Sequence, residues 1–120
     1  MLDDDATILT ALGMLLEEWG FETIGAATPE DVLAQIAQRR RRPDVIVADY
    51  FLPGGRTGTD AIRQIRAYCN APVPSIVLTG DTGPERALEV GRIGSHLLQK
   101  PVMPDMLQDM VHRLAGLPKR

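Results

Sequence analysis

The sequence predicts an α/β fold in which a doubly wound parallel sheet carries helices on both faces, in one domain over residues 1–120. Three observations predict this fold. The length of 120 residues allows one domain and leaves little for a second. Segments with helical spacing alternate along the chain with short apolar runs. Two of these runs, Asp44–Asp49 and Ser75–Thr79, are continuously apolar, which is typical of strands buried on both faces of a parallel sheet.

The first helix is predicted over about Ala6–Trp19. Asp5 can cap its start and Gly20 can close its end. Its apolar residues recur at helical spacing, namely Ile8, Leu12, Leu15, Leu16 and Trp19. A short strand is predicted next, over Phe21–Ala26.

The second helix is predicted from the N-cap Thr28 to about Gln38, because a first-turn proline and two acidic residues follow the cap. The basic run Arg39–Arg42 and the proline after it form a break. The apolar run Asp44–Asp49 is then the next strand, largely β-branched and closed by an acid.

A glycine- and proline-rich loop, Pro53–Gly58, leads to a helix predicted over about Thr59–Tyr68. Ser75–Thr79 is the following buried strand. A helix near Pro84–Gly91 and a short strand over His96–Leu98 come next. Strands and helices then alternate along the whole chain if a further strand precedes the first helix.

The last helix is predicted over about Pro104–Ala115. We expect its inward face to carry Leu107, Met110, Val111 and Leu114. Met106 and Met110, four residues apart, are interpreted as fillers of the core.

Composition narrows the class of protein without naming it. Hydrophobic residues make up 44% and charged residues 24% of the chain, as in ordinary globular domains. No apolar run is long enough to span a membrane, and Cys69 is the single cysteine, so we expect a cytoplasmic domain. The net charge of −3 favours neither nucleic acid nor a membrane surface as partner, and the run Arg39–Arg42 is interpreted as a solvated loop.

Polar residues follow several predicted strands. The triplet Asp3–Asp5 follows the first, Asp49 the third, Thr79 the fourth and Lys100 the fifth. In open parallel sheets the ligand site lies outside the carboxyl ends of the strands. Clustered carboxylates raise one another's pKa without a cation, and oxygen ligands of this kind suit Mg²⁺. An aspartate nucleophile, a metal, a cation and a hydroxyl donor together describe a phosphoryl-transfer site.

Four motifs occur in order along the chain: Asp3-Asp4, Asp49-Tyr50-Phe51-Leu52-Pro53-Gly54, Leu78-Thr79-Gly80 and Lys100-Pro101. This ordered set resembles the CheY-like receiver domain of response regulators in two-component systems. The resemblance covers essentially the whole chain. It implies a flavodoxin-like sheet of five strands in the order 2-1-3-4-5. It also implies a phosphorelay partner, either a histidine kinase or a histidine phosphotransfer protein.

The resemblance also implies the metal ligands. Asp49 would be both the phosphoacceptor and a ligand of Mg²⁺. Asp4 would bind the ion directly and Asp3 through water. Phe51 would contribute only its backbone carbonyl, which leaves its side chain free to vary.

The phosphoryl site is implied in the same way. Thr79 and Lys100 would bind the phosphoryl oxygens, and Gly80 would leave room for the phosphate and its donor. The bond from Lys100 to Pro101 resembles the cis peptide of the family. Such a domain would catalyse its own phosphorylation and dephosphorylation, and its fourth helix, fifth strand and fifth helix could pair in a homodimer.

The sequence departs from the family at three places. Leu97 stands where receivers usually carry an aromatic switch residue, three positions before the lysine, which puts the usual coupling to Thr79 in question. The loop from Asp49 to Gly58 looks one residue longer than usual. Only Met1 and Leu2 precede the acidic triplet, so we expect a short or truncated first strand, in a chain that begins partway into the domain.

Three function hypotheses follow. The leading one is a phosphoacceptor receiver, whose parent is a stand-alone protein, a hybrid sensor histidine kinase or a transcription regulator. The stretch Leu97–Pro101 resembles hybrid-kinase receivers most. The second hypothesis is a phosphorylation-independent interaction module, a pseudo-receiver. The third is an aspartate-nucleophile phosphatase, which is weakened because Phe51 stands where a general acid is needed.

Overall fold

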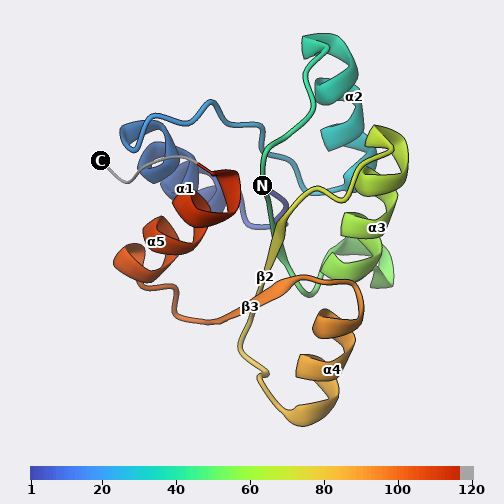
Figure 1. Ribbon diagram of the computed structural model, residues 1–120, viewed down its shortest axis with the longest axis vertical. Coiled ribbons are helices and arrows are strands. Elements are labelled where there is room, and N and C mark those ends of the chain that lie inside the picture. Colours follow the sequence, from blue (N-terminus) through green and yellow to red (C-terminus); the bar gives the residue numbers. More distant parts are fainter. Residues whose placement is uncertain (117–120) are drawn as a thin grey trace.

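The structure is a computed structural model that describes residues 1–116. Three layers are visible in Figure 1, with a central sheet between two sets of helices. One face of the sheet carries α1 and α5, and the other carries α2, α3 and α4. The elements are α1 (Ala6–Glu18), α2 (Pro29–Arg39), β1 (Ile46–Asp49), a 3₁₀ turn (Pro53–Gly55), α3 (Gly58–Cys69), β2 (Ser75–Thr79), α4 (Pro84–Arg92), β3 (His96–Gln99) and α5 (Pro104–Ala115).

The sheet of the described residues has three parallel strands in the order β1-β2-β3. Leu2 extends it by single parallel bridges, to Ala48 on one side and to Ala26 on the other. Across the sheet, the neighbouring segments follow the order Ala26, Leu2, β1, β2 and β3, which is the order of the predicted 2-1-3-4-5 arrangement. The expected first strand is reduced to the single residue Leu2 with its two bridges, in agreement with the prediction of a short first strand.

The strand predicted over Phe21–Ala26 is wrong except for the bridge at Ala26. A strand needs a partner along its length, and the backbone hydrogen bonds described at the far end of this segment go to Met1 and Asp3. The Met1 amine donates to the Ile24 carbonyl at 2.7 Å, and the Ala26 amide donates to the Met1 carbonyl at 3.1 Å. These contacts fix the end of the segment without building a ladder along it.

The apolar core fills both sides of the sheet. Every residue of β1 and β2 is buried, as continuously apolar strands predict. One cluster joins the sheet to α2, α3 and α4, and the other joins it to α1 and α5. The most deeply buried large side chains include Leu2, Ile62, Ile65, Ile76, Leu78 and Leu107.

Local signals place the helix ends where the sequence predicted them, to within one or two residues. Asp5 accepts hydrogen bonds from the amides of Thr7 and Ile8, and Thr28 accepts one from Asp31. The prediction for α3 was one residue late, because Thr57 caps this helix and Gly58 is its first residue.

One core prediction on α5 is wrong. Met106 is 56% exposed, whereas Met110 packs against the buried cluster. Leu107 and Val111 define the inward face of the helix, and the residue before Leu107 is turned about 100° away from that face.

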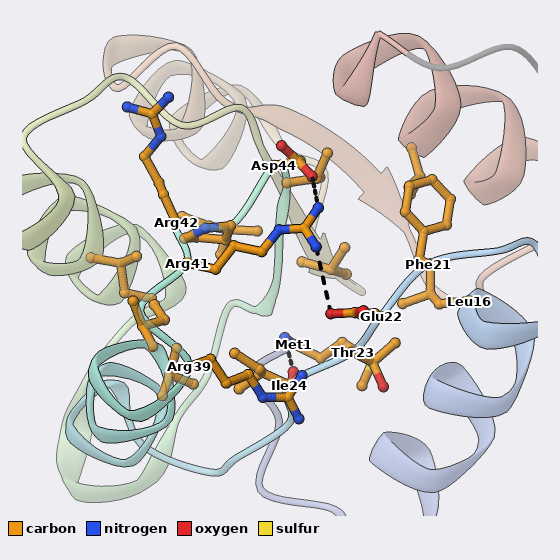
Figure 2. A pocket seen from close by; sticks show the side chains of 18 of the residues that line it. Met1, Leu16, Phe21, Glu22, Thr23, Ile24, Arg39, Arg41, Arg42 and Asp44 are labelled. Atoms are coloured by element: carbon orange, nitrogen blue, oxygen red, sulfur yellow. Dashed lines mark hydrogen bonds and ion pairs between the residues drawn. The ribbon is translucent and has the colours of Figure 1, made fainter.

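A cavity of about 270 Å³ opens at the amino end of β1, the sheet edge opposite to Asp49. Figure 2 shows Met1 and Ile24 on one side of it and Phe21 on another, with arginines at the rim. Arg41 spans this rim, with ion pairs to Glu22 at 3.6 Å and to Asp44 at 3.9 Å. The four residues Arg39–Arg42 are all exposed, as predicted for the basic run. None of the helices described is long and apolar enough to form a transmembrane span.

Candidate functional site

Three carboxylates meet at the carboxyl edge of the sheet. Asp49 is the last residue of β1, and Asp3 and Asp4 directly follow the bridged residue Leu2. One oxygen from each carboxylate lies within 4.8 Å of the others. Asp3 and Asp49 are buried and Asp4 is exposed, so the cluster opens to solvent on one side.

Asp3 carries a buried carboxylate that its surroundings stabilise incompletely. Its Oδ1 accepts a hydrogen bond from the Asp5 amide at 2.9 Å, while its buried Oδ2 has no partner among the described residues. Burial raises the pKa of Asp3, and the charge of Asp49 adds to this, against the lowering effects of the Asp5 amide and Lys100. This buried carboxylate oxygen lacks a hydrogen-bond donor among the described residues. Together with the two neighbouring carboxylates it forms a set of oxygen ligands that suits a hard divalent cation such as Mg²⁺.

Lys100 supplies the cation at this edge. Its Nζ lies 2.8 Å from Oδ1 of Asp49. Its position is fixed by the backbone, because the Lys100 amide donates to the Thr79 carbonyl at 2.9 Å. The peptide bond from Lys100 to Pro101 is cis.

Thr79 ends β2 and is 2% exposed. Its hydroxyl oxygen accepts a hydrogen bond from the Asp81 amide at 3.1 Å. Gly80, the next residue, is exposed, and a side chain there would meet nothing within 4 Å. Crowding within the protein therefore does not require a glycine at this position.

Phe51 comes two residues after Asp49 in the chain. Its side chain is 65% exposed, and its backbone forms an antiparallel bridge to Thr57 across the loop. Its ring packs against that of Tyr50, with the centroids 4.9 Å apart, and the expectation that this side chain takes no part in the site stays a prediction.

Gly58 holds the backbone of Asp49 in place. Its amide donates to the Tyr50 carbonyl at 2.6 Å. A Cβ atom on Gly58 would lie 2.5 Å from the carbonyl oxygen of Asp49, a distance that no side chain tolerates. The sequence suggested only a longer loop here, whereas the structure shows a close approach of two backbones.

A second polar cluster lies beside the site, and sequence reasoning missed it. It contains Tyr50, Thr59, Arg86 and Glu89, with Glu89 at its centre. Tyr50 directly follows Asp49, and Arg86 and Glu89 are three apart on α4. The i, i+3 spacing of opposite charges was the one signal available, and such pairs usually lie in solvent.

The fold and these residues define a class: doubly wound α/β domains with a carboxylate cluster, a threonine and a lysine at the carboxyl edge of the sheet. A family model for the response regulator receiver domain matches residues 1–112. The chain belongs to this family, the receiver domain of two-component response regulators.

Solved structures agree on the fold. A response regulator receiver domain from Clostridium thermocellum has a TM-score of 0.82 at 27% identity, covering 96% of this chain and 90% of that one. The chemotaxis protein CheY4 of Vibrio cholerae also gives a TM-score of 0.82, at 29% identity, covering 94% of this chain and 93% of that one.

Curated relatives are longer than this chain. The DNA-binding response regulator MtrA of Mycobacterium tuberculosis is 37% identical over 82 residues, which cover 68% of this chain and 34% of that protein. The transcriptional regulatory protein ZraR of Salmonella typhimurium is 29% identical over 114 residues, covering 94% of this chain and 25% of that protein. The chain thus spans about a third of the first of these relatives and a quarter of the second.

Proposed function

We propose that this receiver domain, spanning residues 1–120, accepts a phosphoryl group on Asp49. The observation that carries the proposal is the position of Asp49 at the end of β1, 2.8 Å from the Lys100 ammonium and within the carboxylate cluster. A carboxylate oxygen of Asp49 attacks phosphorus, the bond from phosphorus to the donor breaks, and an acyl phosphate forms.

The neighbouring residues have roles that follow from charge and position. Lys100 offsets the negative charge that collects on the phosphoryl oxygens. Thr79 presents a hydroxyl that can donate to one of these oxygens once it turns from Asp81. Gly80 leaves open space beside the phosphoryl group and its donor.

Asp3, Asp4 and Asp49 would hold Mg²⁺, together with the backbone carbonyl of Phe51. The buried Oδ2 of Asp3, which has no hydrogen-bond partner within residues 1–116, supports this assignment. When bound, the ion would neutralise the carboxylates and the transferring phosphoryl group. Asp3 orients the cluster through its bond to the Asp5 amide.

The partner we propose is a phosphohistidine, on a histidine kinase or a histidine phosphotransfer protein in the cytoplasm. In that transfer the bond between phosphorus and the imidazole nitrogen breaks as the bond to Asp49 forms. A homodimer through α4, β3 and α5 is also proposed, since the exposed apolar side chains of Leu88, Met103 and Met106 lie on or beside these elements. Size measurement by light scattering, with and without phosphodonor, tests the dimer.

Of the three possible parents, we propose a hybrid sensor histidine kinase, on the resemblance of Leu97–Pro101 to the receivers of such kinases, with a stand-alone receiver and a transcription regulator as the alternatives. The full open reading frame tests this assignment. A kinase core upstream of the receiver supports it, and a DNA-binding region downstream overturns it.

The phosphorylation proposal is tested by intact-protein mass spectrometry. The domain is incubated with Mg²⁺ and acetyl phosphate, and we expect a gain equal to one phosphoryl group. Asp49→Ala should show no gain, whereas Asp44→Ala, at the other end of the same sheet, should gain as the native protein does. Absence of gain in the native protein, or equal gain in Asp49→Ala, contradicts the proposal.

The pseudo-receiver remains the competing hypothesis, because Leu97 stands where receivers usually carry an aromatic switch residue and because the first strand is short. Titration calorimetry with Mg²⁺ separates the two, because a pseudo-receiver has no need to bind the ion. The presence of all five of Asp3, Asp4, Asp49, Thr79 and Lys100 supports the phosphoacceptor.

A further inference from the structure

The polar cluster beside the site is centred on the carboxylate of Glu89. The buried Tyr50 donates its hydroxyl to both oxygens of this carboxylate, at 2.8 and 3.0 Å. Thr59 donates to Oε2 at 2.8 Å and Arg86 donates to Oε1 at 3.1 Å. Glu89 therefore ties three parts of the fold together: the residue after β1, the first turn of α3, and α4.

Arg86 adds a second tie between α4 and Tyr50. Its guanidinium carbon lies 3.4 Å from the centre of the Tyr50 ring, the geometry of a cation–π contact. The side chain of Arg86 is only 17% exposed. Low exposure strengthens the contacts of this guanidinium, although its Nε has no partner among the described residues.

The cluster touches the proposed phosphoryl site at two points. Tyr50 is bonded directly to Asp49, and its amide donates to the Leu78 carbonyl at 2.9 Å. Arg86 reaches Asp81 at 3.5 Å, and the Asp81 amide donates to the hydroxyl of Thr79. A continuous path of contacts therefore runs from Thr79 through Asp81 and Arg86 to Glu89, and from Glu89 through Tyr50 back to Asp49.

Leu97 makes no polar contact of this kind. It is half-buried and packs against the same apolar cluster to which Tyr50 belongs. An aromatic hydroxyl is thus present near the site, on Tyr50 directly after β1 rather than at position 97.

We propose that Tyr50, Arg86 and Glu89 act as positioning residues that couple the state of Asp49 to α4, in place of an aromatic residue at Leu97. The proposal rests on the proposed phosphorylation of Asp49. The Asp81 amide donates to the Thr79 hydroxyl at 3.1 Å, so a rotation of this hydroxyl toward a phosphoryl oxygen changes that contact. The new negative charge also competes with Asp81 and Glu89 for Arg86. Both changes act on the contacts that hold α4, so α4 shifts between two arrangements.

The test compares two variants that carry the same substitution, tyrosine to phenylalanine, at different positions. Tyr50→Phe keeps the ring but removes the hydroxyl that binds Glu89. Tyr68→Phe removes an exposed hydroxyl on α3 and serves as the matched control, since Tyr68 is 53% exposed. Glu89→Gln is a second variant that keeps the shape and removes the charge. Thermal melting confirms that each variant is folded.

Two quantities are measured on each protein with and without Mg²⁺ and acetyl phosphate: the gain in mass, and the hydrogen exchange of the amides in α4. In the native protein and in Tyr68→Phe we expect both to change. In Tyr50→Phe and Glu89→Gln we expect the mass gain to persist, while the exchange response of α4 falls at least about fivefold, the low end of coupling between sites.

The outcomes separate the two proposals. A full mass gain with an undiminished α4 response in both cluster variants overturns the coupling alone. Absence of mass gain in the native protein overturns the phosphorylation and the coupling with it. A cluster that merely holds α4 in place would raise exchange in both states equally, and that result also overturns the coupling.

Discussion

The ammonium nitrogen of Lys100 lies 2.8 Å from the Oδ1 atom of Asp49, although the two residues come from distant parts of the chain. The contact joins the end of β1 to the residue that follows β3, with β2 between them. Because Asp49 is buried and Lys100 only half-exposed, this pair is screened less than a surface ion pair. It sets the local charge that an incoming phosphoryl group meets.

Removing the ammonium of Lys100 should slow phosphorylation. For Lys100→Gln we expect a loss of about 100-fold in the initial rate of mass gain from acetyl phosphate, as for other groups that stabilise developing charge. Arg56→Gln removes one positive charge from an exposed ion pair with Glu30 and should leave the rate unchanged. Equal rates for Lys100→Gln and the native protein would show that Lys100 does not assist phosphorylation.

Asp3→Asn should make the metal-free protein more stable. The change removes a buried carboxylate whose Oδ2 has no partner among the described residues, so we expect urea unfolding to require about 1–2 kcal/mol more. The native protein should gain stability when Mg²⁺ is added, and the variant should gain much less. A variant that is less stable without the ion, or that responds to it fully, would contradict this reading of Asp3.

Gly58→Ala should destabilise the fold, because its methyl group would collide with the backbone carbonyl of Asp49. We expect a loss of about 1–3 kcal/mol in the free energy of unfolding, as for other overpacked sites. Gly91→Ala is the matched control on α4, where the methyl group meets nothing within 4 Å and alanine should add about 0.5–1 kcal/mol. Similar values for the two variants would show that the close approach is relaxed in solution.

The stability of the 120-residue chain should rise with pH between about 6 and 8. Burial lowers the pKa of the Met1 amine from 8.0 to about 6, so the folded protein resists the proton that the unfolded chain binds. The stabilisation is present in full above pH 8.0 and is lost as the pH falls to about 6, a change of about 2–3 kcal/mol.

Urea unfolding at a series of pH values measures this dependence. A chain acetylated at Met1 is the control, since it has no amine to titrate and shares every other group. Parallel curves for the two chains would show that the amine is solvated rather than buried.

The order of the elements and most of their ends could be predicted from sequence, because each depends on neighbours along the chain. Asp5 and Thr28 cap their helices as expected, and the run Ser75–Thr79 forms β2 residue for residue. Thr79, Asp49 and Lys100 were brought to one edge by the parallel topology alone, since each residue directly follows or ends a strand.

The features that the sequence analysis predicted wrongly or missed depend on contacts between residues that are distant in the chain. The segment Phe21–Ala26 is apolar enough for a strand but has almost no backbone beside it to pair with. The role of Glu89 could not be predicted, because its partners Tyr50 and Thr59 belong to other elements. Gly58 shows the same limit, since only the folded chain brings the Asp49 carbonyl against it.

The register between β1 and β2 has a consequence for how this protein can change. Asp49 is paired with Leu78, and successive residues of a strand face opposite sides of the sheet. A slip of one position would present Ala48 or Tyr50 at the edge in place of the carboxylate. Insertions and deletions can therefore accumulate in the exposed turn Pro53–Gly55, but a single one within β1 would both displace the carboxylate from the edge and exchange the β1 side chains that pack into the two apolar clusters.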